Sequence, residues 1–187
     1  EDPTSLPAGM TKQEYADFLF SDALTEGKDY DLLVMGRTQG KGCYCYVNDV
    51  LKKQIDRYSE RYRFIVVDNE AGMEHVSRGI LPNVDVLLLI SDSSRRGIQA
   101  AGRIARMIGE LNLKAGLVKL VINRARNGVI DEGLKAEVQA QGLDMIGVLP
   151  DDETVYRYDS EGEPCSKVPE ESAIKLAMKD IIGRLGI

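Results

Sequence analysis

The sequence predicts an α/β fold, a doubly wound and mostly parallel sheet with flanking helices. Short apolar runs recur along the chain, and most of them are continuously apolar, which is typical of strands buried on both faces of a parallel sheet. Helical patterns lie between these runs, and alternation of strands and helices is the pattern of a doubly wound sheet. The apolar runs are DLLVM at 31–35, RFIVVD at 63–68, VDVLLLI at 84–90, GLVKLVIN at 116–123 and LDMIGVLP at 143–150.

The helices are predicted from capping residues and apolar spacing. Thr11 and Glu14 form a capping-box pattern, which predicts a helix from there to about Glu26. Three later segments repeat apolar residues every three or four positions, which indicates amphipathic helices. Their apolar positions are Tyr44, Val47, Leu51, Ile55 and Tyr58; then Ile98, Ala101, Ala105 and Ile108; then Ile174, Ala177, Ile181 and Leu185.

Composition limits the class of protein. With 187 residues, 43% of them hydrophobic, the chain is long enough for one domain spanning residues 1–187. A net charge of -6 argues against nucleic acid as a partner, and the apolar runs are too short to cross a membrane. The three cysteines do not make a disulfide framework, so we expect reduced thiols and a cytoplasmic protein.

Polar residues follow several predicted strands, where ligands bind in this class of sheet. Asp68 ends the second run and is followed by a small-residue turn, an arrangement that holds Mg²⁺ in nucleotide hydrolases. The alternative is an aspartate that caps the next helix. Asn123 and Arg124 end the fourth run, and Pro150 begins the sequence PDDE after the fifth. An asparagine side chain matches the donor and acceptor edge of adenine, so these residues predict a base-binding half-site.

These motifs resemble the MinD-like ATPases over nearly the whole chain. The sequences GCYCYVN at 42–48 and DNEAGMEH at 68–75 look like the CooC-type branch, ATPases that help insert nickel into carbon monoxide dehydrogenase. The resemblance implies ATP or ADP with Mg²⁺ as ligands and carbon monoxide dehydrogenase as the client. It also implies metal binding by Cys43 and Cys45 and a magnesium-associated switch role for Asp68. The implied adenine contacts are Asn123, Arg124, Pro150, Asp151 and Asp152.

One part of the family pattern does not match. The family's phosphate-binding loop is glycine-rich with two lysines, whereas GRTQGKG at 36–42 has no serine or threonine after Lys41. The chain also opens at Glu1. We therefore expect an N-terminally truncated domain that lacks its first strand, phosphate loop and first switch. Such a chain should hydrolyse ATP negligibly by itself.

The paired cysteines Cys43 and Cys45 supply two ligands where soft divalent ions take about four. Two chains meeting across a two-fold axis would supply four thiolates, which predicts a homodimer that shares one Ni²⁺ or Zn²⁺ ion. Cys165 has no partner nearby and is interpreted as incidental, and His75 as a solvated loop residue. Two other functions remain open: a non-catalytic dimer module with a structural zinc, and a MinD-like ATPase with another cargo.

Overall fold

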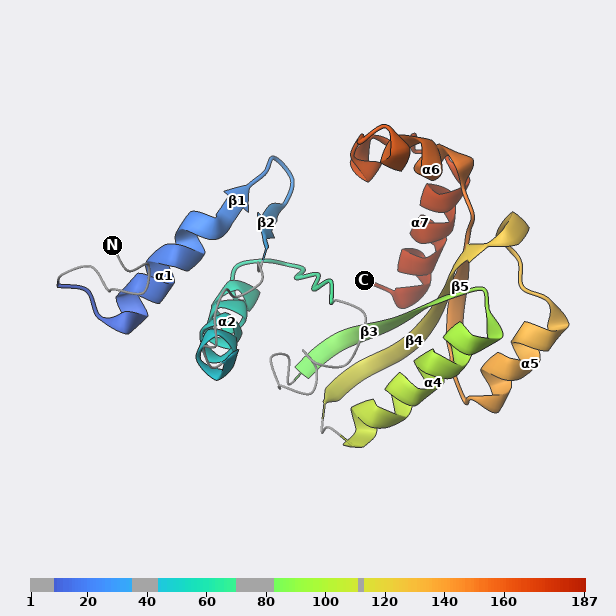
Figure 1. The fold of residues 1–187 in the computed structure, drawn as a ribbon, viewed down its shortest axis with the longest axis horizontal. Coiled ribbons are helices and arrows are strands. Elements are labelled where there is room, and N and C mark those ends of the chain that lie inside the picture. Colours follow the sequence, from blue (N-terminus) through green and yellow to red (C-terminus); the bar gives the residue numbers. More distant parts are fainter. Residues whose placement is uncertain (1–8, 35–43, 70–82, 111–112) are drawn as a thin grey trace. The chain divides into compact units, whose positions relative to one another are not determined.

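The computed structural model describes residues 9–34, 44–69, 83–110 and 113–187, with the backbone alone at Lys12 and over 44–50 (Figure 1). The chain forms two compact units, residues 1–72 and 73–187.

The first unit contains two helices and a small hairpin. Its elements are α1 (Lys12–Ala23), β1 (Leu24–Glu26), β2 (Asp31–Leu33) and α2 (Tyr44–Ser59). The capping box is confirmed, because Thr11 Oγ1 accepts from the Glu14 N–H at 3.2 Å while the Glu14 carboxylate accepts from the Thr11 N–H at 2.8 Å. Helix α1 ends at Ala23, three residues before the predicted end, because the next residues pair as β1 antiparallel to β2.

Two predicted strands of this unit differ from the structure. Of the described residues in the first run, 31–34, Asp31–Leu33 form a strand, and its partner is antiparallel rather than parallel. The predicted strand at 63–68 is wrong, because residues 64–69 contain neither strand nor helix. Val66 is 92% exposed. An apolar run becomes a strand only when a neighbouring backbone supplies hydrogen bonds, and no described residue does so here.

The second unit contains the parallel sheet that the sequence predicts. Strands β3, β4 and β5 lie in that order, and both pairs are parallel. The elements are β3 (Asn83–Asp92), α4 (Arg95–Glu110), β4 (Lys114–Ala125), η1 (Arg126–Gly128), α5 (Glu132–Ala140), β5 (Met145–Pro150), α6 (Glu153–Ser160), η2 (Cys165–Lys167) and α7 (Ala173–Leu185). The three predicted strands and the two predicted helices of this unit are therefore confirmed.

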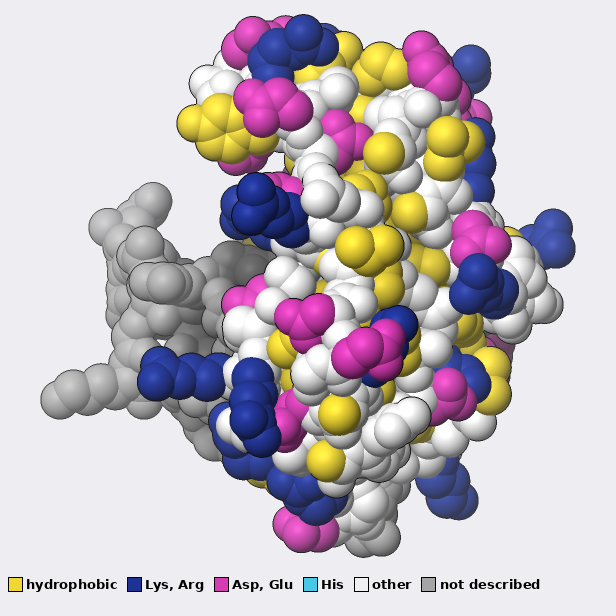
Figure 2. Space-filling view, turned by 90° about the vertical axis from the view of Figure 1, so that its right-hand side faces the viewer, with side chains coloured by type: hydrophobic (Ala, Val, Ile, Leu, Met, Phe, Trp, Pro, Cys, Tyr) yellow, Lys and Arg dark blue, Asp and Glu magenta, His cyan; other side chains and the backbone are white. Residues whose placement is uncertain are grey.

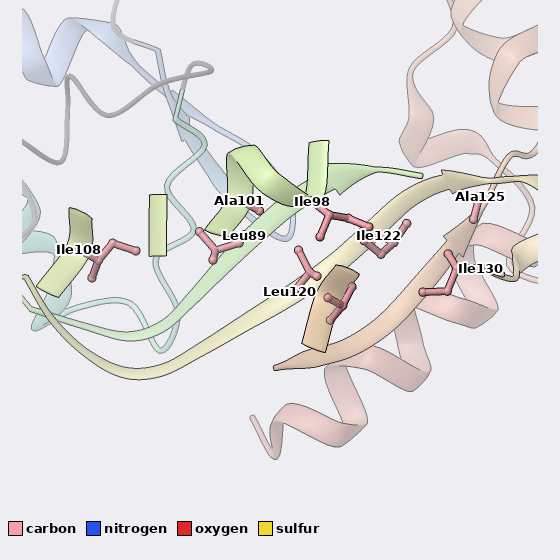
Figure 3. Close-up of a cluster of buried hydrophobic side chains, with 9 residues drawn as sticks. Leu89, Ile98, Ala101, Ile108, Leu120, Ile122, Ala125 and Ile130 are labelled. Atoms are coloured by element: carbon pink, nitrogen blue, oxygen red, sulfur yellow. The ribbon is translucent and has the colours of Figure 1, made fainter. Parts of the chain in front are cut away.

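Helices α4 and α5 cover one face of this sheet, and α7 lies on the other (Figure 1). The larger core lies under α4 and α5, where Leu89, Leu120 and Ile122 of the sheet meet Ile98 of α4 and Val138 of α5 (Figure 3). Leu120, Ile122 and Ile98 are fully buried, at 0% exposure. Except for Val138, these residues come from segments that the sequence pattern marks as apolar, and hydrophobic burial holds the layers together.

The second core is smaller and lies between α7 and strands β4 and β5. Ile181 of α7 packs there against Val121 and Ile146. The pairing register between β4 and β5 shifts by one residue at Leu120 and Val121. At this shift the carbonyl of Ile146 accepts a hydrogen bond from the Arg184 guanidinium at 3.1 Å. The Arg184 side chain thus forms a hydrogen bond with a backbone carbonyl of β5, an outer strand of this sheet.

Strand β3 has one ladder partner, β4, within the described residues. On the face opposite α4, Leu88 and Ile90 of β3 remain 36% and 57% exposed. Leu117 of β4 is 40% exposed. In the part of the chain that the structure describes, the sheet therefore has apolar side chains beside an edge without a ladder partner. No helix among the described residues is long and apolar enough to cross a bilayer.

Candidate nucleotide site

The carboxyl ends of the three parallel strands lie side by side, as the sequence predicts. Asp92 at the end of β3 pairs with Asn123 of β4, and Ala125 of β4 pairs with Pro150 of β5. The Asp151 N–H donates to the Ala125 carbonyl at 2.9 Å. The structure therefore brings the predicted residues that follow β4 and β5 to one edge of one sheet.

Arg124 lies in a bulge of β4. Between the pairs Ile122–Val148 and Ala125–Pro150, β4 has one more residue than β5. Arg124 has a φ of 55°, the left-handed conformation that a residue with a Cβ rarely adopts. Bulges re-aim side chains and are frequent beside functional sites. The Arg124 guanidinium lies 3.5 Å from the Asp151 carboxylate, and both side chains are largely exposed.

Asn123 has a half-exposed side chain whose carbonyl oxygen accepts from the Arg124 N–H at 2.9 Å. This bond uses the amide oxygen, and among the described residues the Nδ2 group has no hydrogen-bond acceptor, so it could donate to a ligand. A base bound at this edge would therefore meet a donor from Asn123 and the Arg124–Asp151 pair beside it. Such a set of groups suits the ring nitrogens of a purine.

Asp152 has a structural role at the carboxyl end of the sheet. Its carboxylate accepts from the Thr154 N–H at 2.8 Å, capping α6, and from the Ile174 N–H at 3.2 Å at the start of α7. Partial burial acts to raise the pKa of Asp152, but the Ile174 and Thr154 hydrogen bonds outweigh it, so the pKa lies below its usual value. Asp152 thus fixes the loop that contains Asp151.

The turn after β3 also lies at this end of the sheet and is not among the predicted site residues. Ser94 Oγ accepts from the Gly97 N–H at 3.0 Å and donates to the Asp92 carboxylate at 2.6 Å. A Cβ at Gly97 would lie 2.1 Å from Asp92 Oδ1, so a larger residue at this position would displace the Asp92 carboxylate. Ser93 Oγ donates to the Arg124 carbonyl at 3.3 Å. The signal was present, because polar residues follow the third apolar run as they follow the second, fourth and fifth.

The predicted metal and switch residues fall elsewhere. Cys43 and His75 lie outside the described residues. Helix α2 begins at Tyr44, so Cys45 belongs to its first turn, as predicted, but its side chain is not among those described. Asp68 is exposed in the irregular segment of the first unit. Within the ranges that the structure describes, no three His, Cys, Asp or Glu residues are grouped to hold a metal ion.

Charge on the face of the second unit seen in Figure 2 is mixed. Lysine and arginine, aspartate and glutamate, and hydrophobic side chains all lie on this face, and several lysine and arginine side chains lie together at its lower left.

No protein-family model matches the sequence. An uncharacterized ATP-binding protein of Methanocaldococcus jannaschii is 39% identical over 180 residues, which covers 96% of this chain and 71% of that protein. The chain belongs to the MinD/ParA-like P-loop ATPase family. The carbon monoxide dehydrogenase accessory protein CooC of Rhodospirillum rubrum is 28% identical over 137 residues. That match covers 72% of this MinD/ParA-like chain and about half of CooC, 51%.

Solved structures show the same MinD/ParA-like fold. A ParA family ATPase of Chlorobium tepidum aligns with a TM-score of 0.70 at 19% identity, over 94% of this chain and 72% of that one. MinD of Pyrococcus horikoshii, solved with Mg-ADP, aligns with a TM-score of 0.68 at 16% identity, over 96% and 74%. At these identities the likeness concerns the fold alone.

Proposed function

We propose that this chain is part of an ATP-dependent maturation factor that binds adenine at the carboxyl ends of β4 and β5. The observation that carries the proposal is the juxtaposition of the Asn123–Arg124 bulge with Pro150 and Asp151 at one sheet edge. Asn123 and Arg124 would recognise the edge of the base, and Pro150 would form one wall beside it. The 39% identical relative, which is an ATP-binding protein, supports a nucleotide as the ligand.

The phosphates and Mg²⁺ would be held by a glycine-rich loop with lysines that this sequence does not contain. Among the described residues β3 has a ladder partner on one edge only, and Leu88 and Ile90 are exposed beside the other edge, which supports a further strand and helix there. Asp68 would contact the hydrated Mg²⁺. This chain without that loop would bind nucleotide weakly and hydrolyse it negligibly.

The metal would be bound by Cys43 and Cys45 of two copies, giving four thiolates around one ion. A cysteine in the first turn of α2 lies near the positive end of the helix dipole, which favours the thiolate. Similarity to CooC supports nickel as the cargo and carbon monoxide dehydrogenase as the client, in the cytoplasm. Thiolate chemistry alone would accept zinc equally well.

The base site is tested by NMR titration of the full chain with ADP and GDP. We expect saturable ADP binding in the millimolar range and weaker GDP binding. Asn123→Ala should weaken ADP binding roughly ten-fold, because a purine-edge contact is lost. Asn83→Ala is the matched control, since Asn83 is an exposed asparagine at the opposite end of the sheet. Equal ADP affinities for the two variants would contradict the proposal.

The metal site is tested by metal analysis together with oligomeric mass. We expect one ion per two chains, and loss of both the ion and the dimer in the double variant Cys43→Ser/Cys45→Ser. Cys165→Ser is the matched control, because Cys165 is an exposed free thiol.

A second candidate is a MinD-like ATPase with another cargo. The observation that favours it is the 39% identity to a protein known only as ATP-binding, against 28% to CooC. ADP binding without stoichiometric metal in the wild type would select this candidate. Stoichiometric zinc in a dimer that never binds ADP would select the third possibility, a structural zinc module.

A further inference from the structure

Arg124 holds a conformation that its own residue type does not favour. Its φ of 55° is left-handed, and a β-bulge surrounds it. A non-glycine residue stays in this region only when neighbouring groups hold it there. Arg124 lies near the carboxyl end of β4, where adenine is proposed to bind, so the groups that hold its backbone also affect that site.

Both peptide groups that flank Arg124 are hydrogen-bonded to side chains. On the amino side, the Arg124 N–H donates to Asn123 Oδ1 at 2.9 Å. On the carboxyl side, the Arg124 carbonyl accepts from Ser93 Oγ at 3.3 Å. The first bond is local, whereas Ser93 belongs to the neighbouring strand end, 31 residues earlier in the chain. Ser93 therefore ties the bulge to another element.

The turn that contains Ser93 is itself fixed. Ser94 binds both the Asp92 carboxylate and the Gly97 N–H, which sets the start of α4. The next residue, Arg95, donates to Glu137 of α5 at 2.7 Å. Glu137 has a side chain only 5% exposed, and it also accepts from the Gln141 amide at 2.9 Å. A buried carboxylate on α5 thus anchors the first turn of α4, directly after Ser93.

We propose that Ser93 is a positioning residue for adenine recognition, acting through the Arg124 backbone. Its hydroxyl holds the left-handed bulge so that Asn123 and Arg124 face the base, and Glu137 stabilises the turn that carries Ser93. This inference rests on the proposed function. The inference adds Ser93 to the residues that determine base selectivity. Ser93 follows the carboxyl end of β3 and does not contact the base.

The experiment compares Ser93→Ala with Ser93→Thr and the wild type in full-chain NMR titrations with ADP and GDP. Ser93→Ala should weaken ADP binding about five-fold, as expected for one lost hydrogen bond, and reduce the preference for ADP over GDP. It should also change the HN–Hα coupling constant of Arg124, which reports φ. Ser93→Thr keeps the hydroxyl and should restore both properties.

Ser160→Ala is the matched control, because Ser160 Oγ donates to the Arg157 carbonyl at 2.9 Å, far from these residues in the sequence. It should leave ADP affinity, selectivity and the Arg124 coupling unchanged. Glu137→Gln gives a second variant, expected to weaken ADP binding less than Ser93→Ala does.

Two failures are distinguishable. In the first, the wild type binds ADP and Ser93→Ala has the same ADP affinity, ADP selectivity and Arg124 coupling constant as the wild type. This result would overturn the positioning role and leave the proposed function standing. Absence of saturable ADP binding by the wild type would overturn the proposed base site, and the positioning role with it.

Discussion

Strand β3 and the segment at 63–68 contain similar apolar runs and have different structures. VDVLLLI lies in a ten-residue strand, and its Leu89 is 6% exposed because β4 pairs with the strand and α4 covers it. RFIVVD has no ladder partner in the described part of the chain, and its Val66 is 92% exposed. Apolar composition makes a strand possible, but a paired backbone and a covering helix make it stable.

The strongest test of this comparison removes one apolar side chain from each region. Leu120→Ala should cost about 3–4 kcal/mol of unfolding free energy, because Leu120 is fully buried and a cavity remains. Val66→Ala should change it by less than about 0.5 kcal/mol, because an exposed side chain loses little contact. Urea denaturation measures both. Similar losses at the two positions would contradict the difference in burial.

Two glycines sharpen the comparison within the second unit. A Cβ on Gly147 would lie 2.4 Å from Ile181 Cγ1, so Gly147→Ala should cost about 1–3 kcal/mol through overpacking. Gly183 of α7 has no atom within 4 Å of that position, so Gly183→Ala should stabilise the helix by about 0.5–1 kcal/mol. Opposite signs of the change in urea midpoint are expected. Two changes of the same sign would contradict the packing between α7 and β5.

The Asp152 cap is a smaller contribution with a defined pH dependence. Asp152→Ala should cost about 1–2 kcal/mol at pH 7, the usual range for a lost N-cap. The pKa of Asp152 is lower in the folded protein than its usual value, so the carboxylate stabilises the fold above about pH 4. This stabilisation is lost as the pH falls through the lowered value.

Stability curves of wild type and Asp152→Ala between pH 7 and pH 2 measure this effect, and the two curves should converge on acidification. Asp159→Ala, which removes an exposed aspartate from α6, is the matched control and should change the free energy of unfolding at pH 7 by less than about 0.5 kcal/mol. A gap between the Asp152→Ala and wild-type curves that stays constant to pH 2 would contradict the cap.

The smallest expected effect lies in the first unit. Thr11→Ala removes the capping box of α1 and should cost about 0.5 kcal/mol, the low end for N-caps, since the cap is exposed. Hydrogen exchange of the Glu14 amide measures it, because this N–H loses its acceptor. Exchange as slow as in the wild type would show that the cap does not stabilise the helix.

The sequence predicts the second unit well for two reasons. Its strands and helices have local apolar patterns, and strands that follow one another in the sequence pair with each other. Leu89, Leu120 and Ile146 lie in runs that each find a neighbouring strand, and Ile98 lies on a clear amphipathic helix. The segment at 63–68 shows the limit of this prediction. Its apolar residues favour a strand, but an apolar pattern does not show whether another strand is present to pair with it.

The candidate site was predicted in the same uneven way. The pattern of polar residues after apolar runs identifies Asn123, Arg124 and Pro150, which the structure brings to one edge. It does not identify the left-handed backbone of Arg124, since arginine carries no preference for that conformation. Nor does it identify Ser93, whose partner lies 31 residues away. The roles of Asp68, Cys43 and Cys45 stay predictions.

The Arg184 bond to the Ile146 carbonyl makes the two outer strands of the sheet unequal. The Ile146 carbonyl of β5 is already bonded to Arg184, whereas β3 has no second ladder partner among the described residues and has Leu88 and Ile90 exposed beside that edge. Lateral extension of this sheet is therefore directional. Any self-association that begins from isolated second units should start at β3, and a proline placed at the middle of β3 should arrest it.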